Sequence, residues 1–120
     1  MSDDRAILDE SALAALNEVT GGDVEFFAEL VETFLEDAPN LIREMESAFA
    51  AGNAAEVRRL SHGLKSNGND FGATDFAQLC AALEHQTAGG NLDGAGDQIS
   101  AISREFARVK ASLEARINGG

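Results

Sequence analysis

The chain is built around one interrupted helical stretch, Leu60-Ser61-His62-Gly63-Leu64-Lys65-Ser66-Asn67-Gly68-Asn69-Asp70-Phe71-Gly72. Apolar residues in and before it recur at spacings of three and four, which predicts a helix from about Ala54 to Phe71. The predicted buried side is formed by Val57, Leu60, Leu64 and Phe71. His62 lies far round the helix from these residues, so we expect it to be exposed to solvent, with Lys65 one turn away.

Two glycines within this helix need an explanation. Glycine in a helix interior costs about 1 kcal/mol relative to alanine. At Gly63 we interpret the missing side chain as room for the close approach of another backbone. For Gly68 a loosened helix end remains an alternative.

The rest of the chain shows further helical periodicity and no strand pattern. Predicted helices cover about residues 10–19, a long segment from Asp23 to Gly52, about 74–87, and a last segment from about Ile99 to Ile117. The predicted N-caps of the first helix, the long second helix and the helix that carries His62 are Asp9, Asp23 and Asn53, respectively. The only proline, Pro39, predicts a kink or brief break near Glu36 to Pro39. The connection before the last helix is predicted to contain Gly89-Gly90-Asn91 and Gly94-Ala95-Gly96.

Four substantial amphipathic helices after a short one predict an all-α fold, an antiparallel up-down four-helix bundle with a short N-terminal helix. We expect one domain over residues 9–117, a flexible segment over residues 1–8 and a frayed end over residues 118–120. A length of 120 residues leaves room for one modest core.

Charge and composition limit the classes of partner. The formal net charge of −12 argues against nucleic acid or an anionic membrane as the main partner. No acidic residue occurs between Glu56 and Asp70, and three of the nine basic residues, Arg58, Arg59 and Lys65, lie in that window. This window suggests a site for a phosphate or for an acidic patch on a partner. Neither a signal peptide nor a membrane span is predicted, so we expect a cytoplasmic protein. One complete bundle favours a monomer.

The fourth predicted helix offers a partner for His62. If Phe76, Leu79 and Leu83 point inward, Glu84 lies on a flank that it shares with Ala77 and Ala81. When that flank faces the third helix, Glu84 can accept a hydrogen bond from Nδ1–H of His62, which leaves Nε2 as a free nucleophilic lone pair. The alternatives for Glu84 are a solvated surface carboxylate or a partner for a nearby lysine.

Two further residues have simpler interpretations. His85 lies opposite the apolar stripe of the fourth predicted helix, so we expect a solvated surface residue. Cys80 lies within that stripe and is expected to pack as a small hydrophobic residue. A metal site has little support, because the two histidines lie on different helices and no dense cluster of ligands accompanies them.

The sequence resembles histidine-containing phosphotransfer (HPt) domains of bacterial multistep phosphorelays. The resemblance is carried by His62-Gly63-Leu64-Lys65-Ser66, Gly72-Ala73, Leu79-Cys80, Leu83-Glu84 and the lead-in Phe34-Leu35-Glu36-Asp37-Ala38-Pro39. It implies that His62 accepts a phosphoryl group from a receiver-domain aspartate and passes it to another. It also implies that Lys65 neutralises phosphate charge, that Glu84 orients His62, and that Gly72 closes the third helix. The run Asn67-Gly68-Asn69-Asp70 departs from the family's usual small Ser/Ala residues.

The resemblance also predicts partners and cofactors. Response-regulator receiver domains and a hybrid histidine kinase are the expected partners. Residues expected to contact them are Arg58, Arg59, Gly63, Ser66 and Asn69. No cofactor of its own is expected, because Mg²⁺ would belong to the receiver domain. No nucleotide-binding motif is present, so we expect a phosphocarrier rather than an enzyme. The alternatives are a helical adaptor without phosphotransfer, a detached dimerisation module of a sensor kinase and, last, a metal-binding bundle.

Overall fold

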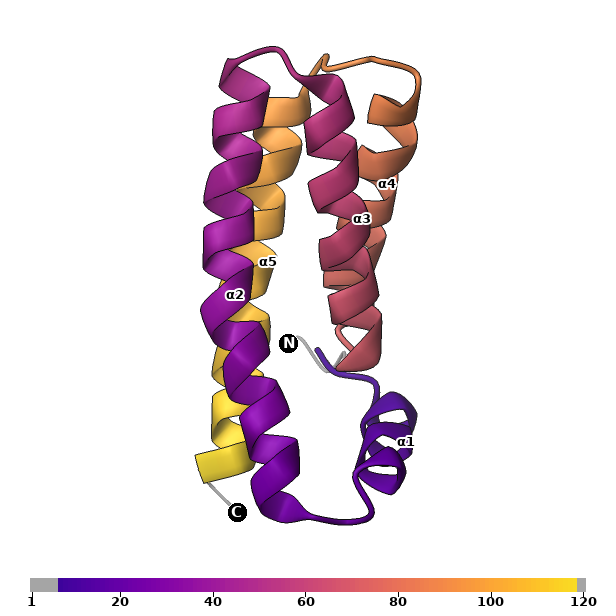
Figure 1. The fold of residues 1–120 in the computed structure, drawn as a ribbon, viewed down its shortest axis with the longest axis vertical. Helices are drawn as coiled ribbons and strands as arrows, with labels where there is room; N and C mark the ends of the chain where they lie inside the picture. Colours follow the sequence, from indigo (N-terminus) through magenta and orange to yellow (C-terminus); the bar gives the residue numbers. More distant parts are fainter. Residues whose placement is uncertain (1–6, 119–120) are drawn as a thin grey trace, which may run out of the picture.

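The computed structural model describes residues 7–118 and contains five helices. They are α1 (Glu10–Val19), α2 (Val24–Ala50), α3 (Ala54–Asp70), α4 (Thr74–Ala88) and α5 (Ala95–Asn118). In Figure 1, α2 to α5 run alternately up and down as an antiparallel bundle. The predicted all-α class, with its short N-terminal helix, is confirmed.

The four bundle helices differ in length, and α1 packs beyond the end of one of the shorter helices. Helices α2 and α5 have 27 and 24 residues, whereas α3 and α4 have 17 and 15. Each bundle helix contacts two neighbours, and α3 packs against α2 and α4 but not against α5. Helix α1 lies beyond the lower end of α3, next to the lower half of α2 (Figure 1).

Side-chain caps fix the starts of the first three helices. The side chains of Asp9, Asp23 and Asn53 accept hydrogen bonds from the backbone N–H groups of Ser11, Phe26 and Glu56, respectively. Each cap pairs one of the N–H groups that a helix start leaves without an internal partner. All three predicted N-caps are therefore confirmed.

Pro39 does not break α2. The helix continues through it from Val24 to Ala50, so the predicted brief break is wrong. The alternative, a kink, agrees with Figure 1, in which the axis of α2 changes direction around its middle. Packing explains the continuity, because Leu35, Ala38 and Ile42 on either side of Pro39 are all buried in the same core.

The start of α5 also differs from the prediction. Ala95 and Gly96 belong to the helix and not to the preceding connection. Ala95 is fully buried, and a Cβ on Gly96 would lie 3.1 Å from the ring of Phe49. This packing against the end of α2 accompanies the extension of the helix through Gly96, a residue of low helix propensity.

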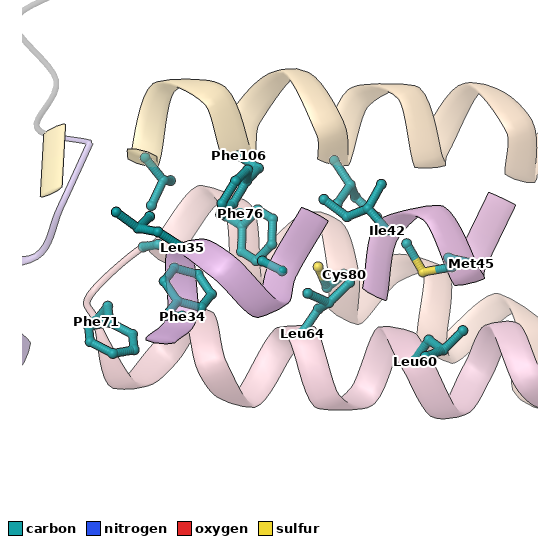
Figure 2. Close-up of a cluster of buried hydrophobic side chains, with 14 of the residues drawn as sticks. Phe34, Leu35, Ile42, Met45, Leu60, Leu64, Phe71, Phe76, Cys80 and Phe106 are labelled. Carbon is teal, nitrogen blue, oxygen red and sulfur yellow. The ribbon is translucent and has the colours of Figure 1, made fainter. Parts of the chain in front are cut away.

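The core joins all the helices through apolar side chains (Figure 2). At one end Phe34 stacks on Phe71 with the ring centroids 4.8 Å apart, and Phe76 and Phe106 meet it edge-on. Towards the other end, α3 contributes Leu60 and Leu64. Cys80 is fully buried there, and burial raises the pKa of its thiol to about 12. It packs as the small hydrophobic residue that was predicted.

The predicted flexible ends fall largely outside the described residues, and their flexibility stays a prediction. Within the described part, Leu8 is 5% exposed and belongs to the core, and α5 extends to Asn118. None of the helices in residues 7–118 combines the length and the apolar character that crossing a membrane requires.

Candidate functional site

Helix α3 places His62 on its outer face because its inner face is fixed by packing. Val57, Leu60 and Leu64 are at most 2% exposed. Ser61 is also fully buried, and its hydroxyl donates a hydrogen bond of 2.8 Å to the carbonyl of Val57. The next residue, His62, has a side chain that is 61% exposed. The predicted exposure of His62 is confirmed.

Gly68 brings α3 and α4 close together. A Cβ at this position would lie 2.8 Å from Cδ2 of Phe76 and 3.4 Å from Cβ of Ala77. Helix α3 continues regularly through Gly68 to Asp70, so the loosened helix end considered for this glycine is wrong. The glycine permits a close contact between α3 and α4 at Phe76 and Ala77.

Gly63 has a different environment. A Cβ added there would meet nothing within 4 Å among the described residues. Packing within residues 7–118 therefore gives no reason for a glycine beside His62. The expected role of Gly63, room for a partner's backbone, stays a prediction.

Glu84 joins His62 and Lys65. Its Oε2 lies 2.9 Å from Nδ1 of His62, and its Oε1 accepts a hydrogen bond of 2.7 Å from Nζ of Lys65. Glu84 and Lys65 are partly shielded, with side chains 18% and 30% exposed. The hydrogen bond from Lys65, and to a smaller extent the one with His62, lowers the pKa of the Glu84 carboxyl below its ordinary value of 4.5.

This arrangement fixes the chemistry of the imidazole. An ionised carboxylate only accepts hydrogen bonds, so a neutral His62 presents Nδ1–H to Glu84 and keeps its lone pair on Nε2. Two predictions for Glu84 are therefore both correct, because it contacts His62 and also a nearby lysine. The two contacts were predicted as alternatives, although the two oxygens of one carboxylate can serve both.

Two hollows flank the histidine–glutamate pair. One, of about 330 Å³, is lined by Ala55, Arg58, Arg59, His62 and Glu84. The other, of about 310 Å³, is lined by Arg58, Lys65, Ala81, Glu84, His85 and Ala88. A larger open hollow of about 730 Å³ lies between α2 and the start of α3, away from His62. The first of the two smaller hollows contains His62 and both contain Glu84 and Arg58, whereas the largest hollow contains none of these residues.

The basic residues at this site differ in their bonding. Arg59 donates two hydrogen bonds, of 2.8 and 2.5 Å, to the carboxylate of Glu56. This pairing raises the pKa of Arg59 and lowers that of Glu56. Arg58 is exposed and forms no hydrogen bond or ion pair with any described residue.

The remaining predicted site residues lie further from the pair. Ser66 and Asn69 are exposed on α3 but line neither of the two hollows beside His62. His85 is exposed, as predicted, at the edge of the second hollow. Within residues 7–118 no group of three or more His, Cys, Asp or Glu side chains is arranged to hold a metal ion.

Comparison with known proteins gives the family. A search of curated proteins returned no match. The structure is similar to a crystal structure of histidine-containing phosphotransfer protein B (HptB) from Pseudomonas aeruginosa PAO1, with a TM-score of 0.87 and 30% sequence identity. The match covers 95% of this chain and 96% of the other. The family model described as "Hpt domain" matches residues 29–114, which include the whole of α3 and α4. The chain therefore belongs to the Hpt domain family.

Proposed function

We propose that this protein is a phosphorelay intermediate that accepts a phosphoryl group on His62 from a receiver-domain aspartate and passes it to another response regulator. The observation that carries this proposal is the state of His62. Its side chain is 61% exposed, while its Nδ1 is held by Glu84 at 2.9 Å. An oriented and accessible nucleophile is the contribution that a phosphocarrier makes, and membership of the Hpt family supports the same role.

The transfer step follows from this tautomer. The lone pair on Nε2 attacks the phosphorus of the aspartyl phosphate, the bond from phosphorus to the carboxylate oxygen breaks, and its electron pair leaves with the aspartate. The proton on Nδ1 stays in place, so the phosphorylated ring carries a positive charge that faces the carboxylate of Glu84. The onward step reverses these changes on a second aspartate and regenerates the neutral imidazole.

The remaining apparatus is proposed to come from the partner. The receiver domain would bring Mg²⁺, and a hybrid histidine kinase would supply phosphate upstream, so this chain needs no ATP site or cofactor of its own. Lys65 is proposed to neutralise phosphate charge and Glu84 to orient the ring. The partner is proposed to bind through a small transient interface formed by Arg58, Arg59, Gly63, Ser66 and Asn69. The chain is proposed to act as a monomer in the cytoplasm.

Incubation with a phosphorylated receiver domain tests the proposal. Wild-type protein should acquire label and His62→Gln should acquire none, because glutamine offers no nitrogen lone pair at the position of Nε2. His85→Gln is the matched control, since it removes the other histidine, and it should be labelled like wild type. Equal labelling of wild type and His62→Gln would contradict the proposal. Receiver binding without labelling of the wild type would favour an adaptor instead.

A further inference from the structure

Charge on a transferring phosphoryl group needs compensation, and the three basic residues near His62 differ in their freedom to provide it. Lys65 is bound through Nζ to Oε1 of Glu84 at 2.7 Å. It lines the hollow that His62 does not line. Arg59 is bound at both ends of its guanidinium fork to Glu56. Each of these two cations already has a carboxylate as its partner.

Arg58 is placed differently. It precedes His62 by four residues on α3, and side chains at this spacing are neighbours on one face of a helix. It lines the hollow of about 330 Å³ together with His62, and it also lines the second hollow, where Lys65 lies. Its guanidinium forms no ion pair with a described residue, so binding an anion there breaks no existing contact within residues 7–118.

We propose that Arg58 is a phosphoryl-binding residue, whose guanidinium binds the phosphoryl oxygens while the group moves to or from Nε2 of His62. A guanidinium presents two parallel N–H donors that match two phosphoryl oxygens, a geometry that lysine cannot reproduce. Lys65 adds its charge from one turn away, while its Nζ stays bound to the carboxylate of Glu84. The inference rests on the phosphoryl transfer proposed above and adds the residue that compensates the negative charge of the phosphoryl group.

A donor that needs no protein partner separates this role from receiver docking. Phosphoramidate can donate its phosphoryl group to Nε2 as the bond from phosphorus to nitrogen breaks and ammonia leaves. Labelling of His62 is followed by intact-mass measurement in wild type and in Arg58→Gln, Arg58→Lys, Arg59→Gln and Arg104→Gln. Arg104 is a matched control for charge, because it is exposed on α5, a helix that does not contact α3.

We expect Arg58→Gln to slow labelling about tenfold, which corresponds to a loss of about 1.4 kcal/mol of transition-state stabilisation. Arg58→Lys should recover part of the rate, because it restores the charge without the fork. Arg104→Gln should match wild type, and Arg59→Gln should lose less than Arg58→Gln. Circular dichroism should show unchanged helix content, since the Arg58 side chain is exposed.

Equal labelling rates for Arg58→Gln and Arg104→Gln would overturn the role of Arg58 and leave the proposed function standing. Full recovery by Arg58→Lys would overturn the bidentate geometry but not the charge. The same series is repeated with a phosphorylated receiver as donor. If neither donor labels the wild type, the proposed function fails, and the inference about Arg58 fails with it.

Discussion

Glu84 is the residue that turns an exposed histidine into an oriented one. A carboxylate has two oxygens, and here each has its own cationic or hydrogen-bonding partner, Lys65 and His62. The ion pair with Lys65 is the first cause of the lowered pKa of Glu84, so Lys65 helps to keep the acceptor of His62 ionised. The three side chains should therefore respond together when one of them is changed.

Two substitutions of Glu84 separate its two contacts. Glu84→Gln keeps an oxygen that can accept from Nδ1–H of His62 but removes the charge that binds Lys65, whereas Glu84→Ala removes both contacts. We expect the Nδ1–H tautomer of His62 to persist in Glu84→Gln and to give way to a mixture in Glu84→Ala. Nitrogen-15 NMR of the imidazole at a pH where the ring is neutral measures this directly.

The same variants should differ in transfer. Loss of one net hydrogen bond of about 0.5–1.5 kcal/mol predicts that Glu84→Ala slows phosphoryl transfer roughly two- to thirteenfold, with Glu84→Gln between it and the wild type. Glu114→Ala is the control, because it removes a carboxylate from α5 that is bound to Lys110 and not to His62. An unchanged tautomer in Glu84→Ala would show that the contact at 2.9 Å does not orient the ring.

Helix α3 contains two glycines whose surroundings differ. Gly68 is buried against α4, and an added Cβ would press on the ring of Phe76, which the core holds in place. Gly63 has only open space beside it among the described residues. The same substitution, glycine to alanine, should therefore have opposite effects on stability at the two positions.

We expect Gly63→Ala to raise the free energy of unfolding by about 0.5–1 kcal/mol, since alanine is the better helix former. Gly68→Ala should lower it by about 1 kcal/mol or more, because overpacking typically costs about 1–3 kcal/mol and exceeds the gain in propensity. Urea denaturation followed by circular dichroism gives both values. If Gly63→Ala also accepts phosphate from a receiver domain more slowly than the wild type does, a partner's backbone uses the space beside Gly63. Stabilisation of the fold by Gly68→Ala would contradict the close contact between Gly68 and Phe76.

The bounds of most elements follow from local sequence signals, and the exceptions have a tertiary cause. Asp9, Asp23 and Asn53 mark helix starts because a cap needs only nearby backbone N–H groups. The continuity of α2 through Pro39 and the inclusion of Gly96 in α5 depend on packing against other helices, which local propensity does not contain. Contact between Glu84 and His62 was predictable as a possibility, but its geometry depends on how α3 and α4 pack against each other.

Taken as one molecule, the bundle has a long pair of helices and a short pair, and α1 packs where the short pair ends. The attachment of α1 to the rest of the bundle is limited. Leu8 and Leu13 are buried, and Asp9 N–H donates a hydrogen bond of 2.7 Å to the carbonyl of Gly72. An exposed ion pair joins Glu10 of α1 to Arg116 of α5. Surface ion pairs typically contribute only about 0–1 kcal/mol, so burial and the contact at Gly72 provide most of the attachment.

Because α1 is short and buries little, we expect its backbone amides to exchange with deuterium earlier than those of α3, through local opening that leaves the rest of the bundle folded. Gly72→Ala should accelerate this exchange strongly. The residue has a φ of +72°, and a Cβ there would lie 2.6 Å from the carbonyl oxygen of Asp9, so alanine is strained and pushes the start of α1 away. Arg116→Gln removes only the ion pair and should have a smaller effect. Hydrogen–deuterium exchange measured by mass spectrometry distinguishes these cases, with the amides of α4 near Glu84 as the internal reference. If α1 exchanges as slowly as α3 in the wild type, α1 unfolds together with the bundle, and His62 depends on it for its stability.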